Sequence, residues 1–368
     1  MTLEVGVLGY RFMGTAHANA LARLPMFFPD APAVERSVLV GRDESALETA
    51  ADRLGFESVA TDWADVVDDV DVFYNLGPNH VHADPSIGAL EAGTPVFCEK
   101  PLAPTLEDAT EMADAAREAG VPNGCAFNYR FVPAIQYAKR LLEAGEIGEI
   151  HHVRGRYLQD WLVDPEAPWS WRNDAELAGS GALGDLGAHT VDLLRFLVGS
   201  DDLAGDIERV SGHLQTFVDE RPTADGHRPV TVDDAYSAQL AFENGAMGTV
   251  EASRFATGHK NDHTIEIHGS NGSLRFSLER LNELEVLGDR GYETVLVTDA
   301  DDPYIDHWWP PGHVIGWEHT FVHENYEFLS AVADGGTFTP SFDDGLAVQH
   351  MLTAIEESDD RGEWITLD

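Results

Sequence analysis

The stretch LEVGVLGYRFMGTAHANALARL, residues 3–24, decides the fold of the first part of this chain. An apolar run, residues 3–8, leads directly to Gly9 and Gly14, and a segment with helical character follows at 15–24. A glycine at the first of these positions permits a tight turn out of a strand, and one at the last permits close packing between helix and strand. The pattern therefore predicts a strand, a glycine loop and a helix, in that order.

The loop itself, GYRFMG at 9–14, matches the dinucleotide-binding pattern G-x-G-x-x-G at two of its three glycines. Arg11 stands where the middle glycine normally lets the backbone approach a pyrophosphate. Its side chain must either turn outward or lay the guanidinium across the phosphates, which adds a charge-assisted contact. We expect a dinucleotide to be held by Gly9, Arg11, Phe12, Met13 and Gly14.

Strand-like and helix-like runs alternate through the first third of the chain, which predicts a parallel sheet covered by helices on both faces. The expected strands are 3–8, 37–41, 70–76, 94–99 and 123–129. After a helix at 133–145 the pattern changes to long strand-like runs joined by short turns, interrupted by a helix at 190–197. These runs, which predict an open antiparallel sheet, are 150–161, 210–218, 236–243, 248–256, 263–270 and 274–279. Helices near 319–332 and 342–357 and a strand at 363–367 close the chain.

The predicted fold is α/β: an N-terminal Rossmann domain, residues 1–127, followed by a C-terminal α+β domain, residues 128–368. The second domain is expected to carry a large, open, mostly antiparallel sheet and to serve substrate binding and oligomerisation. A chain of 368 residues is long enough for two hydrophobic cores.

Acidic residues outnumber basic ones by 65 to 23, and the formal net charge is −42. The acids are spread over helix faces and loops, which indicates a solvated acidic coat. At molar salt the Debye length is only ~3 Å, so the self-repulsion of such a coat is screened. We therefore expect a halophilic environment. Nucleic acid is a poor partner for this surface.

Cys98 and Cys125 are the two cysteines, and neither has a metal-ligand spacing. We expect both to be reduced and buried. No apolar run approaches the ~18 residues of a membrane span, and the chain passes from Met1-Thr2 into a strand-like run with no signal-peptide pattern. The expectation is a cytoplasmic protein that does not bind membranes.

The cofactor type depends on the end of the second expected strand, Gly41-Arg42-Asp43. Rossmann proteins that use NAD usually carry an acid there for the ribose 2′-hydroxyl. Glycine at that place and an adjacent arginine favour, or at least permit, a 2′-phosphate, whereas Asp43 is able to serve a ribose hydroxyl. The cofactor is therefore expected to be NAD or NADP, with NADP favoured.

Several motifs together resemble the glucose–fructose oxidoreductase/inositol dehydrogenase (Gfo/Idh/MocA) family. They are the opening GVLGYRFMGTAHANAL, GPNHVH at 77–82, GALEAGTPVFCEKPLAPTLEDA with its Glu99-Lys100-Pro101 motif, FNYRF at 127–131 and GALGDLGAHTVDLLRFLVG at 181–199. The resemblance extends over essentially the whole chain. The stretch RGRYLQDWLVDPEAPWSWR most resembles a subgroup that includes levoglucosan dehydrogenase-like enzymes. Arg11 and Gly41 depart from the family pattern.

The resemblance implies that Lys100, Asp185 and His189 are catalytic in oxidation of a secondary alcohol. A lysine amine has an ordinary pKa of about 10.4, while imidazole starts near ~6.5 and needs little adjustment to act at neutral pH. We therefore expect His189 to accept the hydroxyl proton, Lys100 to orient the hydroxyl and stabilise the alkoxide, and Asp185 to bind a substrate hydroxyl or orient the pair. A relay through Lys100 and His189 is the alternative.

The same resemblance extends the expected sites. Besides the loop, the expected cofactor residues are Arg42, Asp43, Pro78, Asn79, His82, Glu99 and Lys100. The expected substrate residues are Asn128, Arg130, Tyr157, Gln159, Trp161, Asp185, His189 and His319, of which Tyr157, Gln159 and Trp161 alternate along one expected strand. Trp317, Glu318 and His319 form a candidate lid. No metal is expected, because no cysteine–histidine grouping of a zinc dehydrogenase is present.

The leading function is an NAD(P)-dependent dehydrogenase that transfers a hydride between a secondary alcohol of a sugar, anhydrosugar or cyclitol and nicotinamide. Two alternatives stay open: a redox-cycling, sugar-modifying enzyme with tightly bound NAD, and a non-catalytic nucleotide-sensing regulator. The broad sheet of the second domain resembles the usual oligomer interface of the family, so a homodimer or homotetramer is expected.

Overall fold

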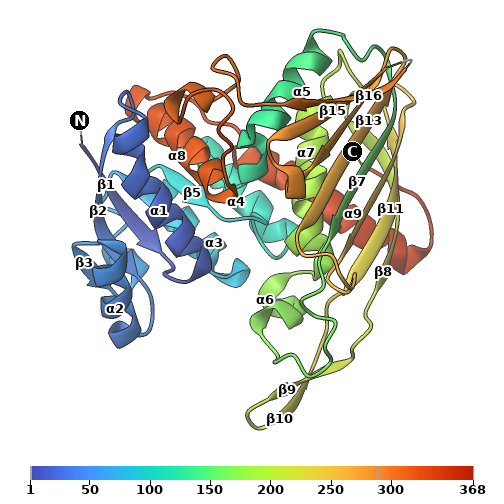
Figure 1. Cartoon of the computed structure of the whole chain (residues 1–368). Helices are drawn as coiled ribbons and strands as arrows, with labels where there is room; N and C mark the ends of the chain where they lie inside the picture. Colours follow the sequence, from blue (N-terminus) through green and yellow to red (C-terminus); the bar gives the residue numbers. More distant parts are fainter. Residues whose placement is uncertain (1, 289, 368) are drawn as a thin grey trace. The chain divides into compact units, whose positions relative to one another are not determined.

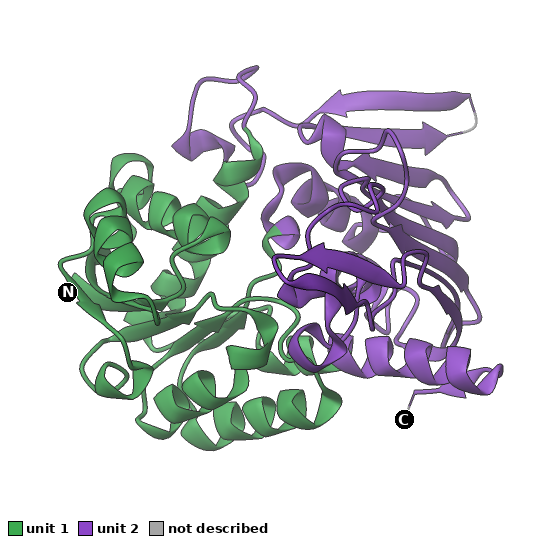
Figure 2. Ribbon diagram, turned by 90° about the horizontal axis from the view of Figure 1, so that it is seen from below, with its two compact units in different colours: residues 1–128, 316–347 green, residues 129–315, 348–368 purple. Residues whose placement is uncertain are grey.

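The structure is a computed structural model that describes residues 2–288 and 290–367. By internal packing the chain divides into two compact units, shown in Figure 2. Unit 1 comprises residues 1–128 and 316–347, and unit 2 comprises residues 129–315 and 348–368. The prediction of a single boundary after residue 127 differs from this division, because a segment near the end of the chain packs with unit 1.

Unit 1 contains a six-stranded, fully parallel sheet in the order β3-β2-β1-β4-β5-β6. Its strands are β1 (Thr2–Leu8), β2 (Ala33–Val40), β3 (Ser58–Ala60), β4 (Val72–Asn75), β5 (Val96–Cys98) and β6 (Asn123–Cys125). The strand order reverses between β1 and β4, and ligands of open α/β sheets bind at the carboxyl ends of the strands at such a point.

Helices cover both faces of the unit 1 sheet (Figures 1 and 2). They are α1 (Phe12–Phe27), α2 (Glu44–Leu54), α3 (Ala83–Glu91), α4 (Leu106–Ala119) and α8 (Trp317–Asp334), with 3₁₀ turns η1 (Trp63–Asp65) and η2 (Asn79–Val81) near the strand ends. A third 3₁₀ turn, η3 (Asn128–Phe131), begins in unit 1 and continues into unit 2. α8 packs against α1. α9 (Phe342–Arg361) begins in unit 1 and ends in unit 2.

Capping residues define the ends of the surface helices. Asp43 accepts a hydrogen bond from the backbone N–H of Ala46 at the start of α2, and Thr105 does the same for Asp108 at the start of α4. Gly55 and Gly120 end these two helices in the left-handed conformation, which costs a glycine little. These local signals explain why the sequence pattern located the elements of unit 1 well.

Unit 2 is built on a nine-stranded mixed sheet in the order β16-β15-β14-β13-β7-β12-β11-β8-β17. β7 and β12 are parallel and every other adjacent pair is antiparallel. The strands are β7 (Ile150–Leu158), β8 (Ile207–Gln215), β11 (Ala235–Phe242), β12 (Met247–Ser253), β13 (Asp262–Gly269), β14 (Ser273–Ser277), β15 (Glu283–Gly288), β16 (Gly291–Leu296) and β17 (Ile365–Thr366). The predicted fold class, with a mostly antiparallel second sheet, is confirmed.

The helical segments of unit 2 include two that pack on its sheet, α5 on β15 and β14 and α7 on β7 and β13 (Figure 1). The segments are α5 (Pro133–Glu143), η4 (Trp171–Asn173), α6 (Ala175–Ala178), the π-turn η5 (Leu183–Gly187), α7 (Ala188–Val198), η6 (Leu278–Arg280) and η7 (Ile305–His307). A separate hairpin, β9 (Glu220–Thr223) and β10 (Gly226–Pro229), was not predicted, and neither was the pair β15–β16.

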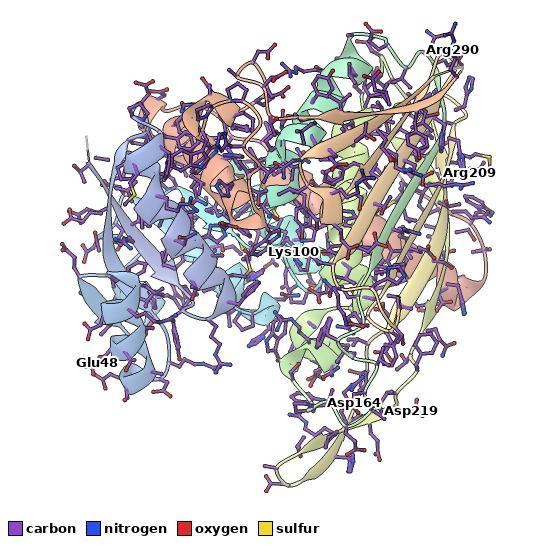
Figure 3. The ribbon with its side chains drawn as sticks, viewed as in Figure 1. Glu48, Lys100, Asp164, Arg209, Asp219 and Arg290 are labelled. Carbon is purple, nitrogen blue, oxygen red and sulfur yellow. The ribbon has the colours of Figure 1, made fainter. Side chains whose placement is uncertain are left out.

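Exposed acidic side chains lie on both units. Glu48 of α2 and Asp164 and Asp219 of unit 2 are exposed and labelled in Figure 3. Cys98 and Cys125 are buried free thiols. No helix within residues 2–288 and 290–367 combines the length and apolarity needed to cross a membrane.

Candidate active site

The glycine loop connects β1 to α1 in unit 1, and both of its glycines are sterically required. Gly9 has φ of 107°, and a Cβ there would lie 2.6 Å from the carbonyl oxygen of Leu76. A Cβ on Gly14 would lie 2.2 Å from the carbonyl oxygen of Gly9, so only glycine lets the helix approach the strand this closely. The loop has the shape of a dinucleotide cradle.

Arg11 occupies the N-cap position of α1 with φ of −89°, a value open to any L-residue. The middle position of this loop therefore does not require a glycine, which explains how an arginine is accommodated. Within the described structure, no side chain caps the first turn of α1 and no acid lies in it. Free N–H groups and the positive end of the helix dipole attract phosphate, so these residues fit the pyrophosphate of a dinucleotide.

The missing acid at the end of β2 has a steric cause. A Cβ on Gly41 would lie 2.5 Å from the ring of Tyr10, so that ring fills the space an acidic side chain would need. Arg42 is exposed beside it. Asp43 uses one carboxylate oxygen to cap α2, accepting from Ala46 N at 3.1 Å.

The loop after β4 is shaped by two buried side chains. Asn75 donates from Nδ2 to the carbonyl oxygens of Val81 and His82 at 2.9 and 3.0 Å. The ring of His82 is fully buried, with Nε2 3.1 Å from Gly77 O and Nδ1 3.0 Å from Pro101 O. Burial lowers the pKa of His82. His82 thus connects the loop that carries the predicted residues Pro78 and Asn79 to the turn after β5. Its side chain points into the protein and stabilises this loop, a role that the motif did not indicate.

Lys100 lies at the carboxyl end of β5 and is labelled in Figure 3; its peptide bond to Pro101 is cis. Glu99 next to it faces inward, with Oε1 3.4 Å from His17 Nε2 and Oε2 accepting from the Lys100 N–H at 3.1 Å. Asn325 Nδ2 lies 3.0 Å from His17 Nδ1. An amide donor at Nδ1 leaves the imidazole proton on Nε2, where it is donated to Glu99. The predicted cofactor residue Glu99 is therefore part of a buried network.

Two predicted substrate residues of unit 1 have internal partners. Asn128 is buried and donates to Thr320 Oγ1 at 2.8 Å. His319 Nδ1 accepts from the N–H of Gly316 at 3.1 Å, at the start of α8, and burial lowers the pKa of His319. Trp317, the first residue of α8, stacks on Phe12 with ring centroids 5.7 Å apart and 15° between the planes. Phe12 is 67% exposed and is the first residue of α1, so this aromatic pair lies on the surface beside the glycine loop.

In unit 2, Asp185 and His189 lie where a π-turn joins an α-helix. Asp185 is in the π-turn η5, and His189 is buried in the first turn of α7. Single π-turns within helices recur at functional sites. In a regular α-helix a spacing of four residues would place both side chains on one face, whereas here the wider π-turn lies between them.

An aromatic cluster surrounds His189. The Tyr129 ring centroid lies 4.6 Å from that of His189, and the hydroxyls of Tyr129 and Tyr157 are 2.8 Å apart. The Tyr157 hydroxyl donates to Asn261 Oδ1 at 2.7 Å. Burial, then Tyr129, and then the charge of Asp185 raise the pKa of Tyr157 well above its ordinary value, so the Asp185 carboxylate belongs to the same group.

Gln159 and His263 complete this group. Gln159 Nε2 donates to the same Asn261 oxygen at 2.7 Å, so Tyr157 and Gln159 share a hydrogen-bond partner, although Gln159 lies beyond the end of β7 and not on the predicted strand face. His263 Nε2 lies 3.1 Å from Thr190 Oγ1. Burial lowers the pKa of His263 to about 3, so this ring is neutral at ordinary pH.

Trp161 and Arg130 differ from their predicted placement. β7 ends at Leu158, so Trp161 does not share a strand face with Tyr157; it is 45% exposed, with the Arg254 guanidinium 5.7 Å from its ring centroid. Arg130 is buried and donates to Asp192, with Nη2 2.6 Å from Oδ1 and Nε 3.0 Å from each carboxylate oxygen. This ion pair fixes α7 to the start of unit 2.

Sequence reasoning missed several residues of these groups. Tyr129 and His17 lie within the quoted motifs FNYRF and GVLGYRFMGTAHANAL, which could have indicated them, but Asn75, Asn261 and His263 carry no motif-level signal. Among the residues the structure describes, no cluster of three or more His, Cys, Asp or Glu side chains is arranged to hold a metal ion.

The strand order, the glycine loop and the open helix N-terminus of unit 1 define a dinucleotide-binding protein. Sequence comparison is consistent with this class and makes it specific. The profile described as "Oxidoreductase family, NAD-binding Rossmann fold" matches residues 3–127, and "GFO/IDH/MocA C-terminal domain" matches residues 135–275. The chain belongs to the Gfo/Idh/MocA family of oxidoreductases, as the motifs predicted.

Individual relatives match over nearly the whole chain. Levoglucosan dehydrogenase of Pseudarthrobacter phenanthrenivorans is 41% identical, covering 99% of this chain and 97% of that protein. The structure of a levoglucosan dehydrogenase in complex with NADH and levoglucosan aligns with a TM-score of 0.95 and 43% identity, covering 100% of this chain and 99% of the other. D-xylose 1-dehydrogenase [NADP(+)] of Haloarcula marismortui is 28% identical over 74% of this chain and 79% of its own length.

Proposed function

We propose that this chain is an NAD(P)-dependent dehydrogenase that oxidises a secondary alcohol of an anhydrosugar, with sugars and cyclitols as the wider substrate class. The observation that carries the proposal is the joint presence of the dinucleotide loop in unit 1 and the Asp185–His189–tyrosine group in unit 2. The levoglucosan dehydrogenases among its relatives support the anhydrosugar.

The nicotinamide ring supplies the hydride acceptor when the cofactor is bound. We assign its pyrophosphate to the first turn of α1, with Arg11 adding a charged contact. Gly9 and Gly14 shape the loop, and Phe12 and Met13 supply backbone N–H groups. His82 and Glu99 act from inside, by holding Pro78, Asn79 and Lys100 in place.

Proton transfer is assigned to the residues of this chain. His189 accepts the hydroxyl proton, Lys100 orients the hydroxyl and stabilises the developing alkoxide, and Asp185 orients the pair or binds a neighbouring hydroxyl. The contact between Tyr129 and His189 restrains the imidazole, and this restraint favours a single orientation for the base.

Substrate contacts are assigned to Gln159, Trp161 and His319 in addition to Asp185 and His189. Gln159 is half-buried and already oriented by Asn261, and Trp161 presents an exposed aromatic face to the apolar side of a sugar ring. Asn128, Arg130 and Tyr157 are assigned a positioning role, because each is buried and held by an internal partner.

For the cofactor, the NADH complex of a levoglucosan dehydrogenase relative supports NAD(H), and the turn at Gly41-Arg42-Asp43 is suited to NADP(H) as well. Asp43 retains a carboxylate oxygen beyond the one that caps α2, and the exposed Arg42 suits a 2′-phosphate. Arg42→Ala is expected to weaken NADP(H) binding about tenfold and to leave NAD(H) binding unchanged, measured by titration calorimetry. Equal loss for both nucleotides would contradict this role.

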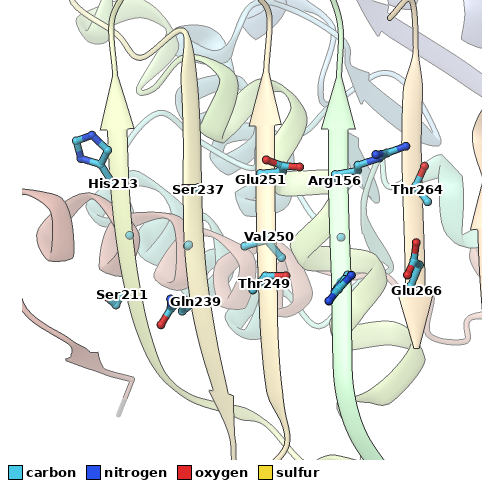
Figure 4. A pocket seen from close by; sticks show the side chains of 14 residues that line it. Arg156, Ser211, His213, Ser237, Gln239, Thr249, Val250, Glu251, Thr264 and Glu266 are labelled. Atoms are coloured by element: carbon cyan, nitrogen blue, oxygen red, sulfur yellow. The ribbon is translucent and has the colours of Figure 1, made fainter. Parts of the chain in front are cut away.

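The face of the unit 2 sheet that carries the exposed side chains of Arg154, Arg156, Gln239 and Glu251 supports a homo-oligomer. Figure 4 shows the 14 residues that line a shallow pocket on this face, with helices behind the strands. Arg154 and Arg156 lie there beside Glu251 and Glu266, so this region is locally neutral in a chain of net charge −42. A second copy of the same neutral, polar face is therefore the partner we propose. Arg156→Glu should shift a dimer or tetramer toward monomer in light scattering at molar KCl.

A turnover screen tests the function. The protein, in molar KCl because of its acidic coat, is mixed with NAD or NADP and a panel of anhydrosugars, aldoses and inositols, and reduced nicotinamide is monitored. Turnover of levoglucosan that disappears in Lys100→Ala supports the proposal. Bound nucleotide without any net reduction across the panel would instead favour redox cycling or a regulator.

A further inference from the structure

Three consecutive backbone N–H groups at the start of the π-turn donate to one residue, Asp233. The N–H of Gly181 donates to Asp233 Oδ1 at 2.6 Å, and that of Leu183 donates to Oδ2 at 2.9 Å. Between them, the N–H of Ala182 donates to the carbonyl oxygen of Asp233 at 3.1 Å. Asp233 is 6% exposed, so water does not compete for these bonds.

The fit at this contact is tight. A Cβ on Gly181 would lie 1.7 Å from the carbonyl oxygen of Asp233, so no other residue allows the two backbones this close. Four residues on, the Asp185 N–H donates to Gly181 O at 2.9 Å. At the far end of the π-turn, a Cβ on Gly187 would lie 2.6 Å from the Tyr236 hydroxyl oxygen. The turn that carries Asp185 is thus held at both ends by the segment that begins β11.

Asp233 is itself held by Arg254, whose side chain is fully buried. Arg254 Nη2 donates to the carbonyl oxygen of Asp233 at 2.8 Å. Burial raises the pKa of the Asp233 carboxyl, and the positive charge of Arg254 opposes this effect. The same guanidinium lies 5.7 Å from the ring centroid of Trp161. The Arg254 side chain therefore connects the segment that holds the start of the π-turn to a proposed substrate contact.

We propose that Asp233, supported by Arg254, is a positioning residue that sets the backbone from which Asp185 and His189 act. This inference rests on the proposed function for its catalytic meaning, although the restraint itself is independent of it. A carboxylate accepts at both oxygens, and asparagine would turn an NH₂ group toward one of the two N–H donors. Asp233→Asn therefore removes one hydrogen bond and places the NH₂ group of the asparagine against a buried backbone N–H, so that two donors face each other.

The adjacent Asp234 provides a matched control. It is fully buried, and its Oδ2 accepts from the N–H groups of Phe217 and Val218 at 2.8 and 3.2 Å. Asp234→Asn makes the same substitution one residue along, beside a loop that carries no proposed catalytic residue, and the amide oxygen is able to replace Oδ2 as the acceptor of both N–H groups. Both variants are expected to lose conformational stability.

The experiment compares wild type, Asp233→Asn and Asp234→Asn in kcat, sugar KM, nucleotide Kd and hydrogen exchange of residues 181–187. For Asp233→Asn we expect a kcat about 100-fold lower, KM and Kd within about twofold, and faster exchange in 181–187. For Asp234→Asn we expect kcat within about threefold and unchanged exchange there. Equal losses of kcat in the two folded variants, or unchanged exchange in Asp233→Asn, would overturn the proposal.

Failure of the proposed function would give a different pattern. If the wild-type protein turns over none of the sugars, the proposed dehydrogenase reaction is ruled out. Hydrogen exchange of residues 181–187 in wild type and Asp233→Asn would still decide whether Asp233 restrains the π-turn. The two failures are therefore distinguishable.

Discussion

Tyr157 and His263 stack face to face in unit 2, with ring centroids 4.5 Å apart and planes 7° from parallel. Because burial lowers the pKa of His263 to about 3, the stacked imidazole is neutral. The stack supports the Tyr157 hydroxyl that contacts Tyr129, and Tyr129 in turn lies against His189. A buried neutral histidine thus orders the group around the proposed base.

This stack predicts an acid-sensitive stability. An unfolded histidine takes up a proton near pH ~6.5, whereas folded His263 does not until about pH 3, so the unfolded state binds more protons between these values and stability falls as pH drops. From pH 7 to pH 5 the loss is about 2 kcal/mol. In His263→Phe this part of the loss should vanish, as measured by urea unfolding at both pH values.

The matched control is His151→Phe, since His151 lies on the exposed part of β7 with a 58% exposed side chain. It should keep the wild-type difference between pH 7 and pH 5. A His263→Phe protein that loses as much stability on acidification as wild type would show that His263 is not the source.

Glu356 of α9 predicts the opposite pH dependence. Burial, Asp233 and Asp360 raise the pKa of Glu356 to about 7. The native state then holds a proton that the unfolded state releases near pH ~4.5, so stability falls as pH rises from 4.5 to 7. Glu356→Gln should be more stable than wild type at pH 8, by on the order of 2–3 kcal/mol at low salt, and similar at pH 4.5.

Thermal or urea unfolding at pH 4.5 and 8 measures this difference. Glu357→Gln is the control: its side chain is 45% exposed and pairs with Arg361 at 3.2 Å, so its effect should stay within roughly 0.5 kcal/mol. Equal stability of Glu356→Gln and wild type at pH 8 would argue against a protonated Glu356.

The glycine loop predicts a coupled loss of stability and nucleotide affinity. In Gly14→Ala the new Cβ meets the carbonyl oxygen of Gly9 at 2.2 Å, so α1 must move away from β1. We expect ~1–3 kcal/mol of destabilisation and at least about tenfold weaker NAD binding. Gly336→Ala, whose Cβ would meet nothing closer than 3.8 Å, should change neither. Unchanged NAD affinity in Gly14→Ala would remove this loop from the cofactor site.

The elements of unit 1 were predictable because their signals are local: apolar runs, glycine turns and helix caps lie within a few residues of the structure they set. That residues 316–347 pack with unit 1 was not predictable, because the sequence of an amphipathic helix does not encode which sheet it packs against. In unit 2 the pairing of β7 with both β12 and β13 joins segments about 100 residues apart, for which a single sequence gives no register.

Motifs located candidate residues more reliably than they located side-chain directions. Glu99 and Arg130 lie in quoted motifs, yet their side chains face His17 and Asp192 inside their own units. The spacing of a motif predicts where in the fold a residue lies, whereas the direction of its side chain depends on contacts with residues far away in the sequence. Asp233, which no motif marks, is found only through the three N–H groups that it binds.

Arg11 predicts a salt-dependent contribution to cofactor binding. It is exposed at the N-cap of α1, where a guanidinium lies within reach of a phosphate held by the first helical turn. Arg11→Gly restores the usual loop residue but removes the charge, so we expect NAD affinity to fall about three- to tenfold at 0.1 M salt. At molar KCl the difference in NAD affinity between wild type and Arg11→Gly should be smaller, because salt screens the attraction between the guanidinium and the phosphates. Arg11→Lys, which keeps the charge but not the planar guanidinium, should bind NAD more tightly than Arg11→Gly at 0.1 M salt. Calorimetric titration of the three proteins at the two salt concentrations measures this, and an Arg11→Gly affinity equal to that of wild type at 0.1 M salt would place the guanidinium in solvent, away from the phosphates.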